Sequence, residues 1–382
     1  MTALAAIILA PFAVLTLFFA VEVFAGLLSR PMPRRHGTGD ASAVVVIPAH
    51  DEELVIGETV RRLSEALGDR MRVLVVADNC GDGTADRARA SGVEVIERKD
   101  SSLRGKGHAL AFAVDHLAAT APDVLVVLDA DCTIDAPSLR ALIENAAGTG
   151  RPSQTINLLK PDRTASPLVQ LSTFAFMLKN LVRQRGLQRL AGRVHLTGTG
   201  MAMPFGLFQS SAHVRSSIVE DLALGLELAE QGKAPQLVTD AFVWSGSSTE
   251  QGTLIQRRRW EGGFLATAAR YGPRTLVRGN VMAALDLMVP PLALFAALNL
   301  AALTIGAMLT LALDSEWWPV LGHAAILAVA GFAVVAAWLR EGRRFVSLGV
   351  LARVPLYVLW KLPMYMGLAR RGAPAEWLRT GR

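Results

Sequence analysis

The stretch Val124-Leu125-Val126-Val127-Leu128-Asp129-Ala130-Asp131 is an apolar run that ends abruptly in two carboxylates. Such a run is typical of a strand that is buried on both faces of a parallel sheet. Residues two apart in an extended segment point the same way, so Asp129 and Asp131 are expected to face one point. Two carboxylates there suit a hard divalent cation that also keeps water and phosphate oxygens as ligands. A solvated turn is the alternative interpretation.

The same alternation of apolar runs and helical spacing extends back to residue 42. Strands alternating with helices predict an α/β fold with a parallel sheet covered on both faces. Ligands bind beyond the carboxyl ends of such strands, and Asp51, Asp78 and Asp129 each fall at or just after an end. We therefore expect three acids to converge on one edge. The predicted strands are Ala43–Ile47, Arg72–Ala77, Val93–Glu97 and Val124–Leu128, and the predicted helices are Glu53–Leu67, Thr84–Ser91 and Gly107–Leu117.

Two turns after these strands carry polar residues. Asp78 opens a turn that runs to Thr84, where its carboxylate could accept a hydrogen bond from a nucleobase imide, while Asp82 and Thr84 suit the cap of the next helix. Arg104-Gly105-Lys106-Gly107-His108 is too short for a Walker loop. Its glycines allow close approach of a ligand, and Lys106 could neutralise a phosphate. A solvated loop is the alternative.

The next part of the chain is less regular. Pro167–Leu190 predicts an amphipathic helix, Thr197–Pro204 a glycine-containing turn and strand, and Val219–Gln231 a further helix. Glu220 and Asp221 lie in the first turn of that helix, where the helix dipole favours acids. The functional interpretation makes Asp221 a general base that takes a proton from an attacking hydroxyl. Displacement with a single base would invert the attacked carbon.

The run Gln256-Arg257-Arg258-Arg259-Trp260 places an amide, a guanidinium and an indole at near-helical spacing. Arg259 suits a diphosphate through bidentate hydrogen bonds, and Trp260 could stack on a sugar ring or an acceptor. The alternative is a basic, membrane-facing cluster, which is the interpretation we give to Arg257 and Arg258.

Three segments are long and apolar enough to span a bilayer, which takes ~20 residues. Thr2–Leu28 is interrupted only by Glu22 and has no basic residue before Arg30, which favours an uncleaved anchor over a secretory signal. Glu22 lies near the Arg30 end and is expected to reach the interface. The other two predicted spans are Leu287–Leu313 and Val320–Leu339.

Basic residues gather at Arg30–Arg35, Arg270–Arg278 and Arg340–Arg344, whereas the link Asp314–Pro319 has none. The positive-inside rule then places residues 30–280 and the tail in the cytoplasm. The net charge of +6 fits an anionic membrane face and an anionic substrate. No interleaving of aromatic and basic residues points to nucleic acid.

Phe345–Gly367 is apolar but contains Arg353, Pro355, Lys361 and Pro363. The two charges are costly at mid-membrane, and the two prolines are expected to break a helix. We therefore predict an amphipathic segment that lies in the cytoplasmic interface and keeps its charges in water.

The chain has only two cysteines, Cys80 and Cys132, both on the predicted cytoplasmic side. Cytoplasmic thiols stay reduced, so no disulfide is expected, and two cysteines are too few to indicate a zinc site.

Together, these motifs resemble the membrane-bound family 2 glycosyltransferases, which include cellulose, hyaluronan and ceramide-glucoside synthases. The likeness covers residues 42–265 and, more loosely, the flanking apolar segments. It implies an α/β fold of the GT-A type, a Rossmann-like and mostly parallel sheet with flanking transmembrane helices. The implied domains are an anchor (1–30), a cytoplasmic catalytic domain (31–280), a transmembrane helix pair (281–340) and an interfacial segment with a cytoplasmic tail (341–382).

The resemblance assigns the donor side of a site. Pro48 and Glu52 fall in the opening strand and nucleotide turn, and Asp78 matches a uridine-binding Asp, although Ala77 replaces the first Asp of the family's usual pair. Lys106 matches a diphosphate-contacting Lys. The resemblance also implies that Asp129 contacts the nucleotide. Together with Asp131, which ends the stretch quoted at the start, Asp129 is expected to hold Mg²⁺ or Mn²⁺ and the sugar diphosphate.

The resemblance also assigns the acceptor side. Asp221 matches the catalytic base of the family. Gln256, Arg259 and Trp260 match the signature that borders the acceptor and the diphosphate. Gly198 and Thr199 belong to a segment that flanks the acceptor terminus.

The implied activity is an inverting transfer of sugar from a nucleotide donor, UDP-linked, to a lipid or lipid-linked glycan. It takes place at the cytoplasmic face of the inner membrane, as in exopolysaccharide or glycolipid assembly, with polysaccharide-assembly proteins as possible partners. Two alternatives stay open: a processive synthase that extrudes its polymer, and a non-catalytic subunit that binds nucleotide. The small membrane portion favours a single addition over export.

Overall fold

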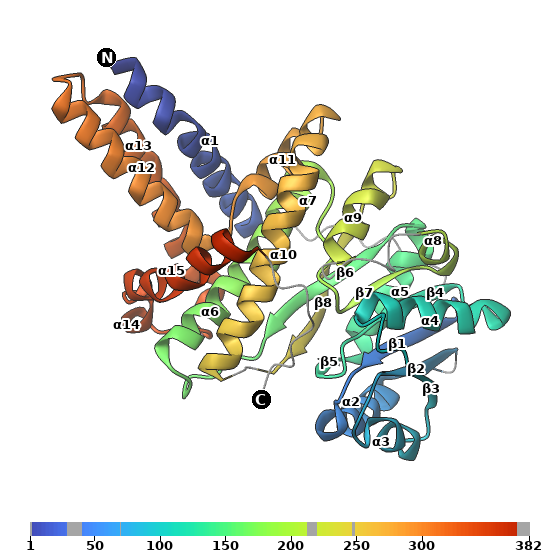
Figure 1. Ribbon diagram of the computed structural model, residues 1–382. Coiled ribbons are helices and arrows are strands. Elements are labelled where there is room, and N and C mark those ends of the chain that lie inside the picture. The colour runs from blue at the N-terminus through green and yellow to red at the C-terminus, as the bar shows by residue number, and fades with distance from the viewer. Residues whose placement is uncertain (1, 29–39, 69, 212–219, 247–248, 373–382) are drawn as a thin grey trace.

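The computed structural model describes residues 2–28, 40–68, 70–211, 220–246 and 249–372. In this part of the chain, eight strands form one sheet in the order β3-β2-β1-β4-β7-β6-β8-β5. Figure 1 shows the sheet at one end of the molecule and a group of long helices, α1, α12 and α13, projecting from the other. The strands are β1 (Ala43–Ala49), β2 (Met71–Asp78), β3 (Glu94–Arg98), β4 (Val124–Val127), β5 (Cys132–Ile134), β6 (Ser153–Leu159), β7 (Met201–Pro204) and β8 (Gln236–Ser245).

The first half of the sheet is parallel, as the sequence predicts: β1 pairs with both β2 and β4, and β2 pairs with β3. Alternate residues of each strand serve opposite cores. Val45 and Ile47 pack toward α2 and α5, whereas Val44 and Val46 pack toward α4. Strands buried on both faces explain the unbroken apolar runs in the sequence. The helices here are α2 (Glu53–Ala66), α3 (Thr84–Ala90), α4 (Lys106–Leu117) and α5 (Ala136–Thr149).

The second half of the sheet is mixed. β7 is antiparallel to β4 and β6, β6 is parallel to β8, and β8 is antiparallel to β5. The predicted turn and strand at Thr197–Pro204 are confirmed as the approach to β7. The predicted helix Val219–Gln231 is confirmed as α9 (Glu220–Glu230), with Val219 outside the described residues. Short helix α8 (Phe205–Gln209) follows β7.

The helix predicted at Pro167–Leu190 exists; its predicted amphipathic character is confirmed for its last part and is wrong for its first part. It runs as α6 (Pro167–Met177), a π-helical turn (Leu178–Arg183) and α7 (Gln184–Ala191). Most residues of α6 and of the π-helical turn are buried, because β6 covers one side while α1, α10 and α15 pack on others. A helix with neighbours all round needs no polar face.

Among the described residues, three helices are long and apolar enough to cross a membrane: α1 (Thr2–Leu27), α12 (Leu292–Ala312) and the run Trp318–Gly342. The last consists of α13 (Trp318–Ala337) and a π-helical turn. The predicted start of the second span at Leu287 is wrong. Pro290 and Pro291 separate α12 from α11 (Val281–Met288), since proline lacks the N–H that would continue a helix.

The predicted position of Glu22 at the interface is wrong. Glu22 is completely buried and accepts a hydrogen bond from Arg183 Nε at 2.6 Å. Arg183 also contacts Asp286 Oδ1 at 2.5 Å, and Asp286 Oδ2 lies 2.5 Å from His195 Nε2. These four residues form the buried ion network, which joins α1 to the sheet domain. The sequence shows no partner for Glu22 because the partners lie far along the chain.

The segment Phe345–Gly367 contains α14 (Leu348–Leu351) and most of α15 (Val354–Arg371). Two expectations for it are wrong. Pro363 lies inside α15 without ending it, and Lys361 is only 1% exposed instead of keeping its charge in water. Lys361 forms an ion pair with Glu261 of α10 (Glu250–Val277), which supplies the missing counter-charge.

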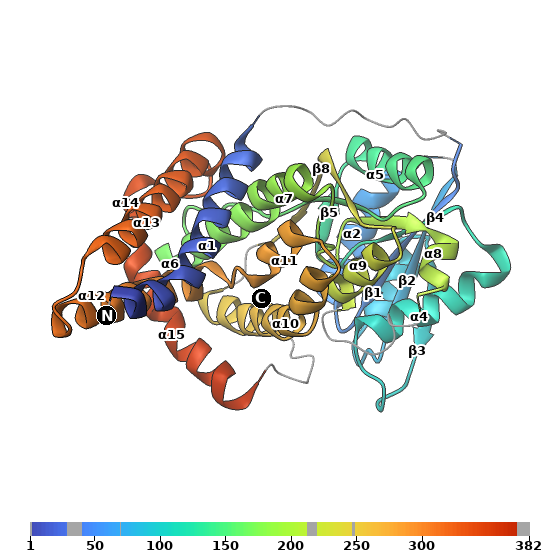
Figure 2. The ribbon, with the colours of Figure 1, turned by 90° about the horizontal axis from the view of Figure 1, so that it is seen from above.

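Seen from above, the apolar helices stand on one side of the molecule and the sheet on the other (Figure 2). α10 and α11 lie between them, and α11 packs against both α10 and α1. Of the predicted basic clusters, Arg270–Arg278 covers the end of α10, and Arg340–Arg344 covers the end of the π-helical turn after α13 and the residues that follow it; Arg30–Arg35 and the tail beyond residue 372 lie outside the described residues.

Candidate active site

Three strand ends meet at one edge of the sheet. β1, β2 and β4 are neighbours and run parallel, so their carboxyl ends lie together. Asp51 follows β1, Asp78 ends β2, and Asp129 lies two residues after β4. The predicted convergence of acids is confirmed, and it sets the position of the site.

Asp78 is almost completely buried and is held by two neighbours. Arg98 Nη1 donates to Asp78 Oδ1 at 2.6 Å, and His50 Nδ1 lies 2.7 Å from the Asp78 carbonyl oxygen. Sequence reasoning missed Arg98. It is the last residue of β3, so the rule that polar groups at strand ends share an edge could have found it. The edge thus presents a carboxylate oxygen beside a guanidinium.

The turn after β2 is fixed by structural hydrogen bonds. Asp82 Oδ1 accepts from the Thr84 amide at 3.0 Å, and the buried Thr84 hydroxyl accepts from the Glu52 amide at 2.8 Å. Asp82 and Thr84 are structural, as predicted, but the predicted cap is wrong: Gly83 is the N-cap of α3, and among the described residues no side chain caps that helix. Pro48 is buried in β1 opposite Val76, and Glu52 immediately precedes α2.

Lys106 ties two parts of the site together. It is the first residue of α4, after Gly105, and its ammonium contacts Asp129 Oδ1. The same ammonium donates to the Gly198 carbonyl oxygen at 2.6 Å. Asp129 itself donates from its amide to the Thr199 hydroxyl at 3.0 Å. Lys106, Asp129, Gly198 and Thr199, predicted from separate motifs, therefore lie together.

The turn of residues 197–200 owes its shape to glycine. Gly198 and Gly200 have φ values of 81° and 59°, a conformation that side chains rarely adopt. Gln154 holds the turn from inside: its amide nitrogen donates to the Thr199 carbonyl at 2.9 Å, and its oxygen accepts from the Thr197 amide at 3.0 Å. Gln154 was not predicted, because a buried glutamine in a strand gives no sign of its partner.

Asp129, Asp131 and Cys132 each offer a ligand atom within 4.8 Å of the others. Burial raises the pKa of the Cys132 thiol to about 12, so it stays protonated and is no ligand for a hard cation. Two carboxylates at this spacing fit one Mg²⁺ or Mn²⁺ ion, whose other ligands are phosphate oxygens and water. Both cysteines are free, which confirms that they form no disulfide.

Asp221 lies in the first turn of α9, beside Gly198. A methyl group added at Gly198 would lie 3.1 Å from Asp221 Oδ2 and 3.6 Å from Lys106 Nζ. Removal from water raises the pKa of the Asp221 carboxyl, although its backbone hydrogen bonds, Lys106 and Lys179 act in the opposite direction. A carboxylate with a raised pKa is a stronger base and suits proton abstraction.

Lys179 is a further cation near Asp221 that sequence reasoning missed. It lies in the π-helical turn, a feature that often marks functional sites. Its ammonium is 4.8 Å from the centre of the Phe264 ring, and Phe264 packs in the same apolar cluster as Leu222, next to Asp221. Lys179 is solvent-accessible, yet the surrounding protein desolvates it enough to lower its pKa.

Gln256, Arg259 and Trp260 lie on α10. The Trp260 ring is 5.5 Å from Phe176 of α6, and it also faces the Arg257 guanidinium at 5.3 Å. The interpretation of Arg257 as membrane-facing is wrong. Arg257 is buried and donates to the Ser172 hydroxyl at 2.8 Å, so it fastens α10 to α6.

A family model described as glycosyltransferase like family 2 matches residues 41–263, more than half of the 382 residues. The chain belongs to glycosyltransferase family 2. The chain is 25% identical over 235 residues to "Probable glycosyltransferase YdaM" of Bacillus subtilis (strain 168), a match that covers 57% of this chain. The match covers 54% of that relative, so the chain spans about half of its length.

One solved structure shares the fold of this chain along nearly its whole length. The mannosyltransferase PcManGT from Pyrobaculum calidifontis, solved with GDP-Man and Mn²⁺, matches with a TM-score of 0.56 over 96% of this chain and 94% of its own. The two are 16% identical. The likeness therefore shows the fold alone and confirms the GT-A-like α/β class. A glucosyl-3-phosphoglycerate synthase from Mycobacterium tuberculosis matches more weakly, with a TM-score of 0.42, 20% identity and coverage of 59% of this chain and 79% of that one.

Proposed function

We propose that this glycosyltransferase transfers one sugar, with inversion, from a nucleotide donor to a hydroxyl group, and that Asp221 is the base. The observation that carries the proposal is the position of Lys106, which contacts Asp129 and the Gly198 carbonyl within reach of Asp221. A group that neutralises the diphosphate therefore lies next to a carboxylate with a raised pKa. A single displacement needs both groups in one site, one on each face of the sugar, because the acceptor oxygen attacks the anomeric carbon from the side opposite the departing diphosphate.

The donor is proposed to carry a base with an imide edge. Asp78 offers an acceptor oxygen, and Arg98 beside it offers N–H donors. This pair complements an N–H next to a carbonyl, as in uracil or guanine. The amino group and adjacent ring nitrogen of cytosine or adenine also form a donor beside an acceptor, so this pair alone does not select the base; the choice of uracil rests on the resemblance of Asp78 to the family's uridine-binding Asp. UDP is our first choice, and the similar mannosyltransferase solved with GDP-Man makes GDP the comparison to test.

Asp129 and Asp131 are proposed to hold Mg²⁺ or Mn²⁺. The bound cation would neutralise charge on the diphosphate as it leaves. Lys106 and Arg259 would share that task, Lys106 from α4 and Arg259 from α10. Asp221 would take the proton from the acceptor hydroxyl, so that the oxygen attacks the anomeric carbon as the bond to the diphosphate breaks.

The acceptor is proposed to be a lipid or a lipid-linked glycan at the cytoplasmic face of the inner membrane. Three helices suitable for spanning support a membrane location. Trp260 lies near α6 and α15, which place aromatic side chains between the proposed site and the apolar helices. Gln256, Gly198 and Thr199 would border the acceptor from the other side.

A transfer assay with the full chain in detergent tests the function. Radiolabelled UDP- and GDP-sugars are supplied with a membrane lipid extract, with and without Mn²⁺ or Mg²⁺. We expect cation-dependent label in the lipid fraction from one donor class. Label confined to the aqueous phase with every donor would contradict the proposal and favour the non-catalytic subunit. A ladder of long products would favour the processive synthase.

The membrane location predicts a cytoplasmic carboxyl terminus. Lys361 of α15 forms an ion pair with Glu261 of α10. This contact to the catalytic domain favours an α15 that stays on the side of that domain and does not cross the bilayer as a further span. Reporter fusions after Arg382 measure the location. A fluorescent protein should be bright and a phosphatase inactive; the reverse pattern would show that the segment Phe345–Gly367 crosses the bilayer.

A further inference from the structure

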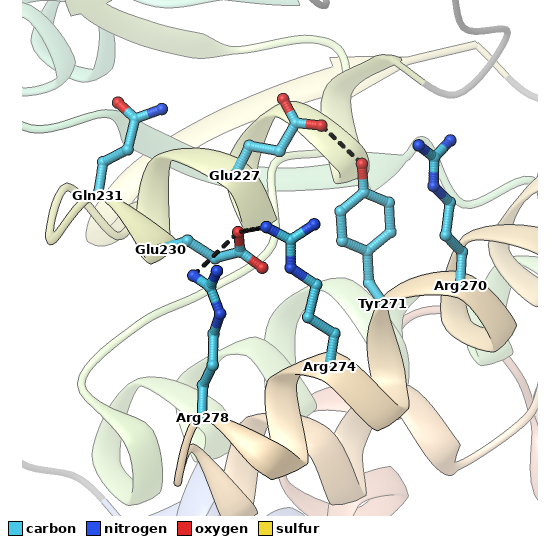
Figure 3. Close-up of a pocket in the computed structure, with 7 residues that line it drawn as sticks. All are labelled: Glu227, Glu230, Gln231, Arg270, Tyr271, Arg274 and Arg278. Atoms are coloured by element: carbon cyan, nitrogen blue, oxygen red, sulfur yellow. Dashed lines mark hydrogen bonds and ion pairs between the residues drawn. The ribbon is translucent and has the colours of Figure 1, made fainter.

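A cavity of about 380 Å³ lies between α9 and the carboxyl-terminal half of α10, away from the proposed active-site residues (Figure 3). Arg270 and Arg274 line it from α10, and Arg278 lines it from the position directly after that helix. Their spacing of four residues places them on one face of the helix. Glu227 and Glu230 face them from α9, as the close-up shows.

The charges in this cavity do not cancel. Glu230 Oε2 accepts from Arg274 at 2.6 Å and from Arg278 at 3.0 Å, so two guanidinium groups share one oxygen. Glu227 accepts instead from the Tyr271 hydroxyl at 2.6 Å. Arg270 lies with its guanidinium carbon 5.5 Å from the centre of the Tyr271 ring. Three guanidinium groups facing two carboxylates leave one net positive charge and several N–H donors for an anion.

An exposed apolar bend adjoins the cavity. Leu276 and Val277 end α10, Val281 and Met282 begin α11, and all four are exposed, Val277 to 88%. Helix α11 packs against α1, and it rises on the side of the molecule toward which α1 extends (Figure 1). Exposed apolar side chains flanked by arginines are typical of a surface that lies in a membrane interface.

We propose that the cavity binds the phosphate of an anionic phospholipid head group while the apolar bend enters the acyl region. Arginine pairs bind phosphate through bidentate hydrogen bonds. A soluble phosphate would leave the bend in water, and a zwitterionic head group would bring its own cation close to the arginines. The inference rests on the membrane location proposed above and not on the transfer reaction.

Thermophoresis of the full chain in detergent tests the proposal with three probes: dihexanoyl-phosphatidylglycerol, dihexanoyl-phosphatidylcholine and inorganic phosphate. The phosphatidylglycerol should bind most tightly. The double variant Arg270→Gln, Arg274→Gln should weaken that binding about tenfold or more, since it removes charge-assisted hydrogen bonds. Val277→Ser should weaken the binding of phosphatidylglycerol and leave the binding of inorganic phosphate unchanged.

Matched controls lie on α2. The double variant Arg61→Gln, Arg62→Gln removes two exposed arginines of an ion-paired helix, and Leu54→Ser removes an apolar side chain that is 91% exposed. Neither should change lipid binding. If the α10 double variant unfolds, the single variant Arg270→Gln is measured in its place. Arg270 forms no ion pair with Glu230, so its loss should leave the contact between α9 and α10 intact.

Equal binding of phosphatidylcholine and phosphatidylglycerol would overturn the proposal, as would phosphate binding as tightly as the lipid, or unchanged binding in the α10 variants. A protein that binds the lipid but transfers no sugar would leave this site standing and remove the proposed reaction.

Discussion

Two clusters of opposite charges differ in their access to water. One is the buried ion network, and the other, the open cluster, consists of Lys106, Asp129 and Asp221 at the edge of the sheet. In the buried ion network, Glu22 is 0% exposed and Arg183 is 6% exposed by side chain. At the sheet edge, the Asp129 side chain is 40% exposed and that of Lys106 is 15% exposed. Each cluster joins residues far apart in sequence. The buried ion network attaches α1 to the rest of the molecule, whereas the side chains of the open cluster can exchange their protein partners for a ligand.

The backbone around the clusters differs as well. Two glycines with positive φ shape the open cluster, where backbone and ligand must approach closely. The buried ion network is surrounded by packed helices, and α1 crosses both the π-helical turn and α7. The two regions meet at that turn, since Lys179 and Arg183 line one small cavity together with His195 and Asp286.

The largest effect is expected from Asp221→Asn in the open cluster. A positioned base contributes roughly 10²–10⁴-fold to rate, so transfer should fall by that factor while nucleotide binding stays nearly intact. Steady-state transfer and calorimetry measure the two properties. The control Asp86→Asn changes an exposed carboxylate on α3 and should leave both unchanged. A variant at position 221 that keeps more than about a tenth of the rate would exclude this carboxylate as the base.

A change in the buried ion network should lower the thermal stability of the protein. Glu22→Ala leaves Arg183 with one carboxylate fewer in a buried place, and breaking a buried pair costs about 3–5 kcal/mol. Thermal unfolding in detergent should therefore begin at a clearly lower temperature. Glu58→Ala removes an exposed ion-paired carboxylate on α2 and serves as the control, with little change expected. An unchanged melting temperature for the position 22 variant would mean that the network does not secure α1.

The metal site gives a third contrast. Asp131→Ala should abolish the part of sugar-nucleotide affinity that depends on Mn²⁺, because one carboxylate alone is a poor site for the cation. Calorimetry with and without Mn²⁺ measures this part. The same Mn²⁺ enhancement in wild type and variant would place the metal elsewhere.

The smallest effect is a shift in pH dependence. The proposed reaction needs deprotonated Asp221, so activity should be lost as the pH falls through the raised pKa of that carboxyl. Lys179 lowers this pKa, and Lys179→Met should therefore raise it and move the acid limb of the rate profile to higher pH. Lys233→Met changes an exposed lysine and should not move the limb. A shift to lower pH would contradict the proposed geometry.

The sequence predicts the parts of the open cluster that obey local rules. Strand ends, the spacing of Asp129 and Asp131, and the glycines of the turn all follow from periodicity and backbone freedom. Arg98, Gln154 and Lys179 escape prediction because each partner is supplied by folding, as when Gln154 reaches a turn 45 residues away. For the same reason, the sequence predicts that Glu22 and Lys361 keep their charges in water. In the structure both are buried, and their counter-charges are Arg183 and Glu261.

The central claim is that one carboxylate at the open cluster drives a single displacement. Proton NMR of the anomeric centre in the transfer product tests it most directly, with the full chain and an α-linked nucleotide sugar. The account predicts a β-linked product from the first turnover. An α-linked product would require a second displacement or a different attack, and would contradict the assignment of Asp221 as the only base.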